Sequence, residues 1–117
     1  MKSHLAAIGI TGILLIPALV TPAAAASFDC DRPDLAADEK VICDTRALND
    51  ADVKMVTTFD ILTSLLAMGN RDKLREEQSA WLKKRQACAG DAECLAGAYA
   101  ERLKQLDEAY QGLSRPL

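Results

Sequence analysis

Residues 75–94 read REEQSAWLKKRQACAGDAEC and hold the single tryptophan of the chain and two of its four cysteines. A helix turns by about 100° per residue. Within an arc of roughly 80°, one face of a helix through this segment carries Leu74, Gln78, Trp81, Arg85 and Cys88. An ordinary amphipathic helix keeps glutamine and arginine off its apolar stripe. The segment therefore predicts a helix whose buried face includes two strongly polar groups.

The first 26 residues have the pattern of a secretory signal peptide. Lys2 supplies a positive start, residues 5–20 form an apolar run, and residues 24–26 are alanines that precede Ser27. A membrane anchor is the alternative, but a bilayer crossing requires about 20 apolar residues and this run is shorter. We therefore expect residues 1–26 to be removed.

A lipid anchor is also disfavoured. A lipoprotein signal places small residues directly before a cysteine, whereas Phe28 and Asp29 precede Cys30. Residues 27–117 are expected to form a single small domain in the periplasm or outside the cell, without a stable membrane anchor.

The expected mature chain is mildly acidic. The whole chain has 14 basic and 17 acidic residues, so that loss of Lys2 changes the formal net charge from −3 to −4. Nucleic acids and anionic membranes bind clustered lysine and arginine. This composition argues against both and weakly favours a cationic partner.

A long helix is predicted over residues 48–68. Its inner face would carry Leu48, Asp52, Met55, Phe59, Leu62 and Leu66. Gly69 is expected to end this helix, because glycine tolerates the left-handed backbone of many helix ends, and Asn70 to cap the next one.

The next long helix is predicted over residues 71–89, with Gly90 ending it and Asp91 capping a fourth helix. The inner face of that fourth helix would carry Leu95, Tyr99, Arg102, Leu106, Tyr110 and Leu113. Asp38 is expected to cap a single helical turn that ends near Cys43. Short connections make successive helices antiparallel, so the fold class is all-α: a small antiparallel bundle of three long helices plus one short amino-terminal helix.

Four cysteines in an exported chain of this size predict two disulfides. Zinc is the alternative, but the spacing contains no Cys-x2-Cys pair and no histidine follows residue 26. Four cysteines allow three connectivities. The turn at Gly90 would bring Cys88 and Cys94 together, so we expect this pair and the local pair of Cys30 with Cys43.

Four polar residues lie on the predicted inner faces: Asp52, Gln78, Arg85 and Arg102. They could form a charged ligand cleft, or internal ion pairs in which Arg85 or Arg102 binds Asp52 or Glu39. A guanidinium contacts a carboxylate at two points, and a buried unpaired charge costs several kcal/mol. We favour a structural polar core.

Trp81 has two interpretations as well. It could be a platform on which a ligand stacks, but it lies between Leu74 and Cys88 on its helix face. We therefore expect it to anchor the core.

The sequence supports neither catalysis nor a cofactor. No histidine follows residue 26 to act as a general base, and disulfide-bonded cysteines do not act as thiolate nucleophiles. Ser64 and Ser79 lack a nucleophile-elbow context, and the glycines are too dispersed for a phosphate loop. We expect a binding protein and no enzyme.

Five fragments of the expected mature chain together resemble a known family. They are Phe28-Asp29-Cys30, Glu39-x-x-Ile42-Cys43, Leu48-x-x-x-Asp52, the string from Arg75 through Gln78, Trp81 and Arg85 to Cys88, and Cys94-Leu95-x-x-x-Tyr99-x-x-Arg102. In this order they resemble the LprI-like family of small exported bacterial proteins.

The resemblance implies lysozyme inhibition through protein–protein contact, and the alternative is a non-inhibitory module of the envelope or of stress tolerance. Animal lysozymes are generally basic, so acidic residues could steer such a partner. The amino-terminal segment offers Asp29, Asp31, Asp34 and Asp38 for this role.

Overall fold

A computed structural model describes residues 26–113 of the chain. Residues 1–25, which hold all but the last residue of the expected signal peptide, lie outside the described residues. The helices are α1 (Ala37–Asp44), α2 (Arg46–Leu65), α3 (Met68–Ala87) and α4 (Ala92–Gln111). The described range contains no strand, so the predicted all-α class is confirmed.

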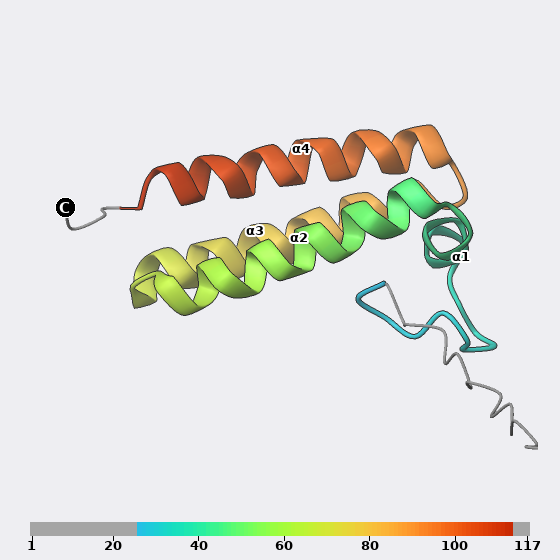
Figure 1. Cartoon of the computed structure of the whole chain (residues 1–117), viewed down its shortest axis with the longest axis horizontal. Coiled ribbons are helices and arrows are strands. Elements are labelled where there is room, and N and C mark those ends of the chain that lie inside the picture. Colours follow the sequence, from blue (N-terminus) through green and yellow to red (C-terminus); the bar gives the residue numbers. More distant parts are fainter. Residues whose placement is uncertain (1–25, 114–117) are drawn as a thin grey trace, which may run out of the picture.

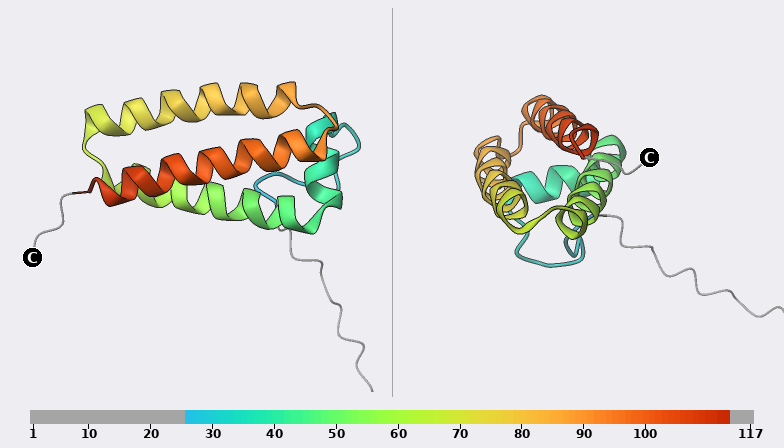
Figure 2. Two further views of the ribbon diagram at one scale, coloured as in Figure 1. Left: turned by 90° about the horizontal axis from the view of Figure 1, so that it is seen from above. Right: turned by 90° about the vertical axis from the view of Figure 1, so that its left-hand side faces the viewer.

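The three long helices lie side by side, and successive ones run antiparallel, as expected from their short connections (Figures 1 and 2). Helices α2 and α4 therefore run in the same direction. The most extensive contact between helices is that of α2 with α4. Helix α1 lies across one end of the bundle and contacts all three long helices. The predicted bundle of three long helices with one short leading helix is therefore correct.

The core follows the predicted helix faces. All five residues of the α3 face are buried: Leu74, Gln78, Trp81, Arg85 and Cys88. The apolar core comprises Ile42, Leu48, Met55, Leu62, Leu74, Trp81, Cys88, Leu95, Tyr99 and Leu106. Every helix contributes to it. Tyr110, which was expected on the inner face of α4, is instead 41% exposed, so the predicted face does not extend to the end of that helix.

The connection between α2 and α3 differs from the expectation. Helix α2 ends at Leu65, and the two residues Leu66 and Ala67 have extended backbones with ψ of 143° and 157°. Gly69 and Asn70 lie inside α3 and neither ends nor caps a helix. Two extended residues reverse the chain without a left-handed backbone, so this turn requires neither glycine nor a polar cap.

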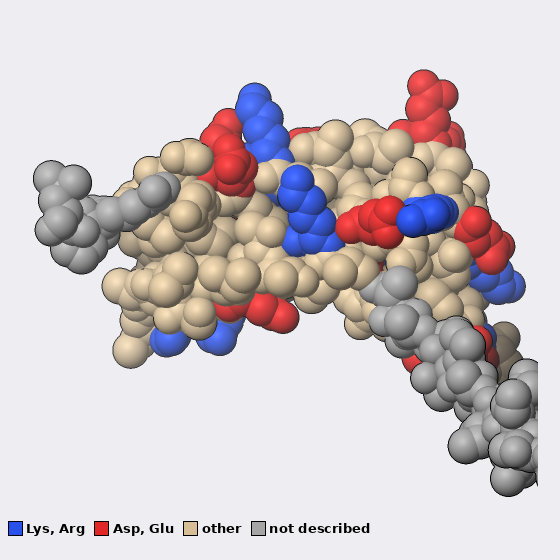
Figure 3. Space-filling model, viewed as in Figure 1, with Lys and Arg blue, Asp and Glu red and all other residues tan. Residues whose placement is uncertain are grey.

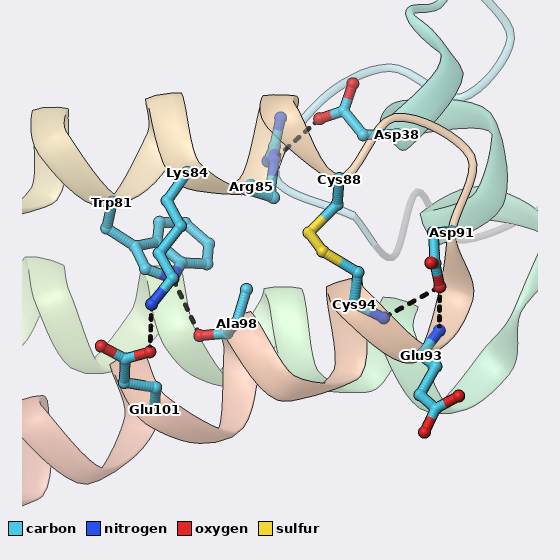
Figure 4. The surroundings of a disulfide bond; sticks show 10 residues. All are labelled: Asp38, Trp81, Lys84, Arg85, Cys88, Asp91, Glu93, Cys94, Ala98 and Glu101. Carbon is cyan, nitrogen blue, oxygen red and sulfur yellow. Dashed lines mark hydrogen bonds and ion pairs between the residues drawn. A yellow bond between two sulfur atoms is a disulfide. The ribbon is translucent and has the colours of Figure 1, made fainter.

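The connection between α3 and α4 agrees with its prediction in part. The Asp91 carboxylate accepts the backbone N–H groups of Glu93 and Cys94 at 3.0 Å each (Figure 4), so Asp91 is the expected cap. The left-handed residue, however, is Ala89, with φ of 50°, and not Gly90. The sequence therefore located the turn correctly but assigned the left-handed backbone to the wrong neighbour.

The start of α1 was wrongly predicted. Ala36 is the N-cap, and the Glu39 carboxylate accepts its backbone N–H at 2.9 Å. Asp38 lies within the first turn of α1 and is 2% exposed. A carboxylate in the first turn is favoured by the helix dipole as well as by capping, and here its side chain points into the bundle.

The predicted disulfides are confirmed. Cys30 is bonded to Cys43 across a separation of 13 residues, and Cys88 to Cys94 across 6. The first bond fixes the amino-terminal segment to α1, and the second joins the ends of α3 and α4 (Figure 4). Both therefore lie at the end of the bundle where α1 crosses it.

Candidate functional site

A buried ionic cluster lies where α1 crosses the bundle. Arg85 donates from Nε to Asp38 Oδ2 at 3.0 Å, and its Nη1 is 3.8 Å from Asp52 Oδ1. Tyr99 donates its hydroxyl to the same Asp52 oxygen at 2.7 Å. Each of the four helices contributes one of these side chains, so the cluster, defined as Asp38, Asp52, Arg85 and Tyr99, joins all of them.

The cluster agrees with the expectation of an internal ion pair between Arg85 and Asp52, but the closer partner of Arg85 is Asp38. Glu39 instead pairs with Arg32 on the surface, at 3.6 Å. Sequence reasoning missed Asp38 because an aspartate that precedes a short helix was interpreted as its cap. Its i, i+4 spacing to the buried Ile42 was the signal that could have placed it inside.

Tyr99 acts in the cluster as a hydrogen-bond donor. Burial raises the pKa of its phenol, and the hydrogen bond to Asp52 raises it further. The hydroxyl therefore keeps its proton well above neutral pH, and Asp52 keeps a fixed donor.

Arg102 belongs to a second polar group. It donates from Nε to Gln78 Oε1 at 2.8 Å, from Nη1 to Gln105 at 3.0 Å and from Nη2 to the Leu74 carbonyl at 3.4 Å. Burial lowers the pKa of this arginine, and the charge of Glu77, 3.9 Å away, opposes that shift. Arg102 therefore pairs with neither Asp52 nor Glu39, the partners that were expected.

Trp81 lies in the core, 5% exposed. Its indole N–H donates to the Ala98 carbonyl at 2.9 Å (Figure 4), and its ring meets Tyr99 edge to face with centroids 5.1 Å apart. The hydrogen bond satisfies the only polar atom of the ring, which favours the role of core anchor over that of a ligand platform.

The segment before α1 forms an exposed acidic arm, which we define by Asp29, Asp31 and Asp34. Asp29 Oδ1 accepts the backbone N–H of Asp31 at 2.9 Å, and Arg32 pairs with Asp34 at 3.1 Å. Asp38, which was expected to belong to this acidic set, is buried in the ionic cluster and cannot face a partner. The steering set is thereby corrected to three aspartates.

The acidic arm is fixed to the bundle at three points. The Ser27 backbone nitrogen donates to Asp52 Oδ2 at 2.6 Å, the Phe28 ring lies 5.5 Å from the Arg85 guanidinium carbon, and Cys30 is bonded to Cys43. A cation above an aromatic face is attracted to it. The exposed aspartates therefore extend from a held segment.

Apolar side chains are exposed at the opposite end of the bundle. Ile61, Leu65 and Met68, here called the apolar tip, are 51%, 58% and 69% exposed. On the face drawn in Figure 3 this end is covered mainly by uncharged side chains. Sequence reasoning missed the tip. The adjacent apolar pairs 61–62 and 65–66 signal it, because neighbours on a helix point about 100° apart and one of each pair faces outward.

An open groove of about 640 Å³ follows the junction of α3 and α4. Leu74 and Trp81 contribute apolar surface to it, and Lys84 and Glu101 form an ion pair between the two helices at its edge (Figure 4). Such a mixture of apolar floor and charged edge is common on helical bundles and does not define a ligand by itself.

Comparison with known proteins identifies the family. A family model described as lysozyme inhibitor LprI matches residues 30–106. This chain belongs to the LprI family. The match begins at Cys30 and ends at the buried Leu106, so the family resemblance deduced from the sequence is confirmed.

Curated relatives support this assignment. Proteins named lipoprotein LprI from Mycobacterium bovis and from two strains of Mycobacterium tuberculosis are 33% identical over 99 residues. The matched region covers 82% of this chain and 48% of each relative, so the chain spans about half the length of the curated LprI proteins it matches. No solved structure matches the chain significantly.

The LprI match covers both disulfides, all five residues of the buried α3 face and all four residues of the ionic cluster. Among the described residues there is no group of acidic, histidine or cysteine side chains placed to hold a metal ion. Within the same range no helix is both long and apolar enough to cross a bilayer.

Proposed function

We propose that this protein is an exported lysozyme inhibitor that acts by protein–protein contact and performs no catalysis itself. The observation that carries the proposal is the LprI lysozyme-inhibitor match over residues 30–106. Removal of residues 1–26 would place the mature domain in the periplasm or outside the cell, where it would meet a lysozyme. The two disulfides suit an oxidising compartment.

The acidic arm is the surface that we assign to steering of the partner. Its three aspartates are exposed, and one of them, Asp34, forms an ion pair with Arg32. Because the arm is held by the Cys30–Cys43 bond and by Phe28, little freedom is lost when a partner binds it. Fixed negative charges accelerate encounter with a basic protein such as an animal lysozyme.

The test is the clearing of bacterial cell walls by c-type and g-type lysozymes in the presence of the purified, disulfide-intact protein. We expect clearing to slow at micromolar excess. Unchanged clearing would eliminate inhibition of those enzymes and leave the non-inhibitory envelope module as the function.

Charge variants test the assigned surface. Replacing Asp29, Asp31 and Asp34 by asparagine should lower the association rate about tenfold at low ionic strength and by much less in high salt. The matched control replaces three exposed acids elsewhere: Asp60, Asp72 and Asp107. An equal decrease of the association rate in both triple variants would show that net charge alone explains the effect. The arm would then have no particular role in steering.

A further inference from the structure

The buried ionic cluster contains more negative than positive charges. Asp38 and Asp52 each contribute a negative charge, and both pair with a single cation, Arg85. Tyr99 is a neutral donor. Among the ion pairs of the described residues, no second arginine or lysine reaches either carboxylate, so the cluster has one negative charge in excess at 0–6% exposure of its charged side chains. An unpaired charge at this depth costs several kcal/mol.

The atom that best reaches this excess charge is the backbone nitrogen of Ser27. It lies 2.6 Å from Asp52 Oδ2, the oxygen that Tyr99 and Arg85 leave free. Phe28 against Arg85 and the Cys30–Cys43 bond hold this nitrogen in place. While residues 26 and 27 are joined, the nitrogen is an amide and donates without a charge.

The same nitrogen lies at the expected processing site. Four alanines precede Ser27, and they supply the small residues that a signal peptidase recognises before its cleavage site. Hydrolysis of the bond between residues 26 and 27 adds water: the carbonyl carbon becomes a carboxylate and Ser27 becomes an amine. That amine takes up a proton at neutral pH, since α-amino groups have pKa values near 8.

We infer that cleavage between Ala26 and Ser27 creates an α-ammonium group that pairs with Asp52 and completes the buried ionic cluster. The site is thus a processing site whose product, the new amino terminus, is a structural cation. Removal of the leader would change the charge of the cluster from one negative to neutral. The inference depends on the cleavage position and not on lysozyme binding, so it stands or falls separately from the inhibitor function.

The pH dependence follows from the groups that face the amine. Asp52 on α2 raises the pKa of a paired ammonium, Arg85 on α3 opposes this, Asp38 on α1 balances Arg85, and Tyr99 on α4 is neutral. An amine whose folded pKa is raised contributes its full stability below about pH 8 and loses it as pH rises through the folded pKa.

The first experiment determines the amino terminus of the exported protein by intact mass. The second compares the melting temperature of the protein that begins at Ser27 with that of the protein that retains Ala26. At pH 6–7 we expect the Ser27 form to melt about 5 °C or more above the extended form, and the gap to shrink above pH 9. A mature protein that begins elsewhere, or equal melting temperatures at pH 6–7, would overturn the inference.

Controls separate the ion pair from other effects of the extension. Ser27→Ala keeps the amine, and its exposed side chain makes no contact that the cluster needs, so its melting temperature should be unchanged. In an Asp52→Asn background, retention of Ala26 should have no effect. If that variant does not fold, the rate at which the Ser27 amine is acetylated supplies the readout. An amine paired with Asp52 in this part-buried position should react more slowly than the same amine after denaturation, and equal rates would refute the pairing.

Discussion

Single residues of the ionic cluster should control stability. Asp38→Ala leaves Arg85 without its closest carboxylate at a site where the arginine side chain is 6% exposed. We expect a loss of about 3–5 kcal/mol in the free energy of unfolding, measured by urea denaturation. The control is Asp50→Ala, which breaks an exposed pair with Arg46 and should cost less than about 1 kcal/mol. Similar losses in the two variants would show that the cluster is no more than a surface pair.

Tyr99 should give the cluster a dependence on alkaline pH. Its pKa is raised in the folded protein by burial and by Asp52, whereas an unfolded tyrosine ionises near pH 10. Above about pH 10 the unfolded chain loses this proton first, so stability falls as pH rises. Tyr99→Phe should remove that part of the fall and cost about 1–3 kcal/mol at pH 7, because Asp52 loses a donor. Identical alkaline profiles for the two proteins would contradict this assignment.

For single residues, the sequence predicted which side chains are buried better than it predicted which of them contact one another. Helical spacing alone placed Gln78, Trp81 and Arg85 on a buried face. The partner of Arg85 depends on how α1 crosses the bundle, and helical spacing contains no information on that angle. Asp38 was assigned to the surface although it is buried, because an aspartate before a short helix was interpreted as its cap.

At the scale of one helix, α4 should gain stability from removal of a glycine. Gly97 lies in the interior of α4, is exposed, and has no atom within 4 Å of the position that a Cβ would take. Gly97→Ala should therefore raise the free energy of unfolding by about 0.5–1 kcal/mol, because the unfolded chain becomes less flexible. Ala96→Gly, at an exposed neighbouring position, should lower it by a similar amount. A destabilised Gly97→Ala protein would mean that this surface is occupied in solution.

Helix boundaries show where local signals suffice. The cap at Asp91 was predictable because a carboxylate before a helix accepts hydrogen bonds from two N–H groups of its first turn. The end of α2 was not, because Leu66 and Ala67 adopt extended backbones that most residue types tolerate. The nearby Gly69 then gave a false signal inside α3.

For the whole molecule, the two disulfides should contribute unequally. Loop-closure entropy predicts about 3 kcal/mol for Cys30–Cys43, which spans 13 residues, and about 2 kcal/mol for Cys88–Cys94, which spans 6. The first bond also holds the arm that brings Ser27 to Asp52. Replacing Cys30 and Cys43 by alanine should therefore lower the urea midpoint more than replacing Cys88 and Cys94. The reverse order would indicate that the arm contributes little to stability.

The fold of the whole molecule was predictable because three helical periodicities and two short connections leave few arrangements. The acidic arm and the Cys30–Cys43 bond that holds it could be predicted, but its two other points of attachment could not. Its attachment depends on Phe28 and Ser27 reaching side chains of α3 and α2, and contacts this distant in sequence leave no periodic pattern.

The apolar tip and the ionic cluster lie at opposite ends of the bundle. Local unfolding should therefore begin at the apolar tip. One end is joined by both disulfides, α1 and the cluster. At the other end α2 and α3 are connected only by Leu66 and Ala67. Amide hydrogens should thus exchange fastest near that turn and become progressively protected toward Cys43 and Cys88. The helices should separate at the tip at a lower free energy than at the end that the disulfides join.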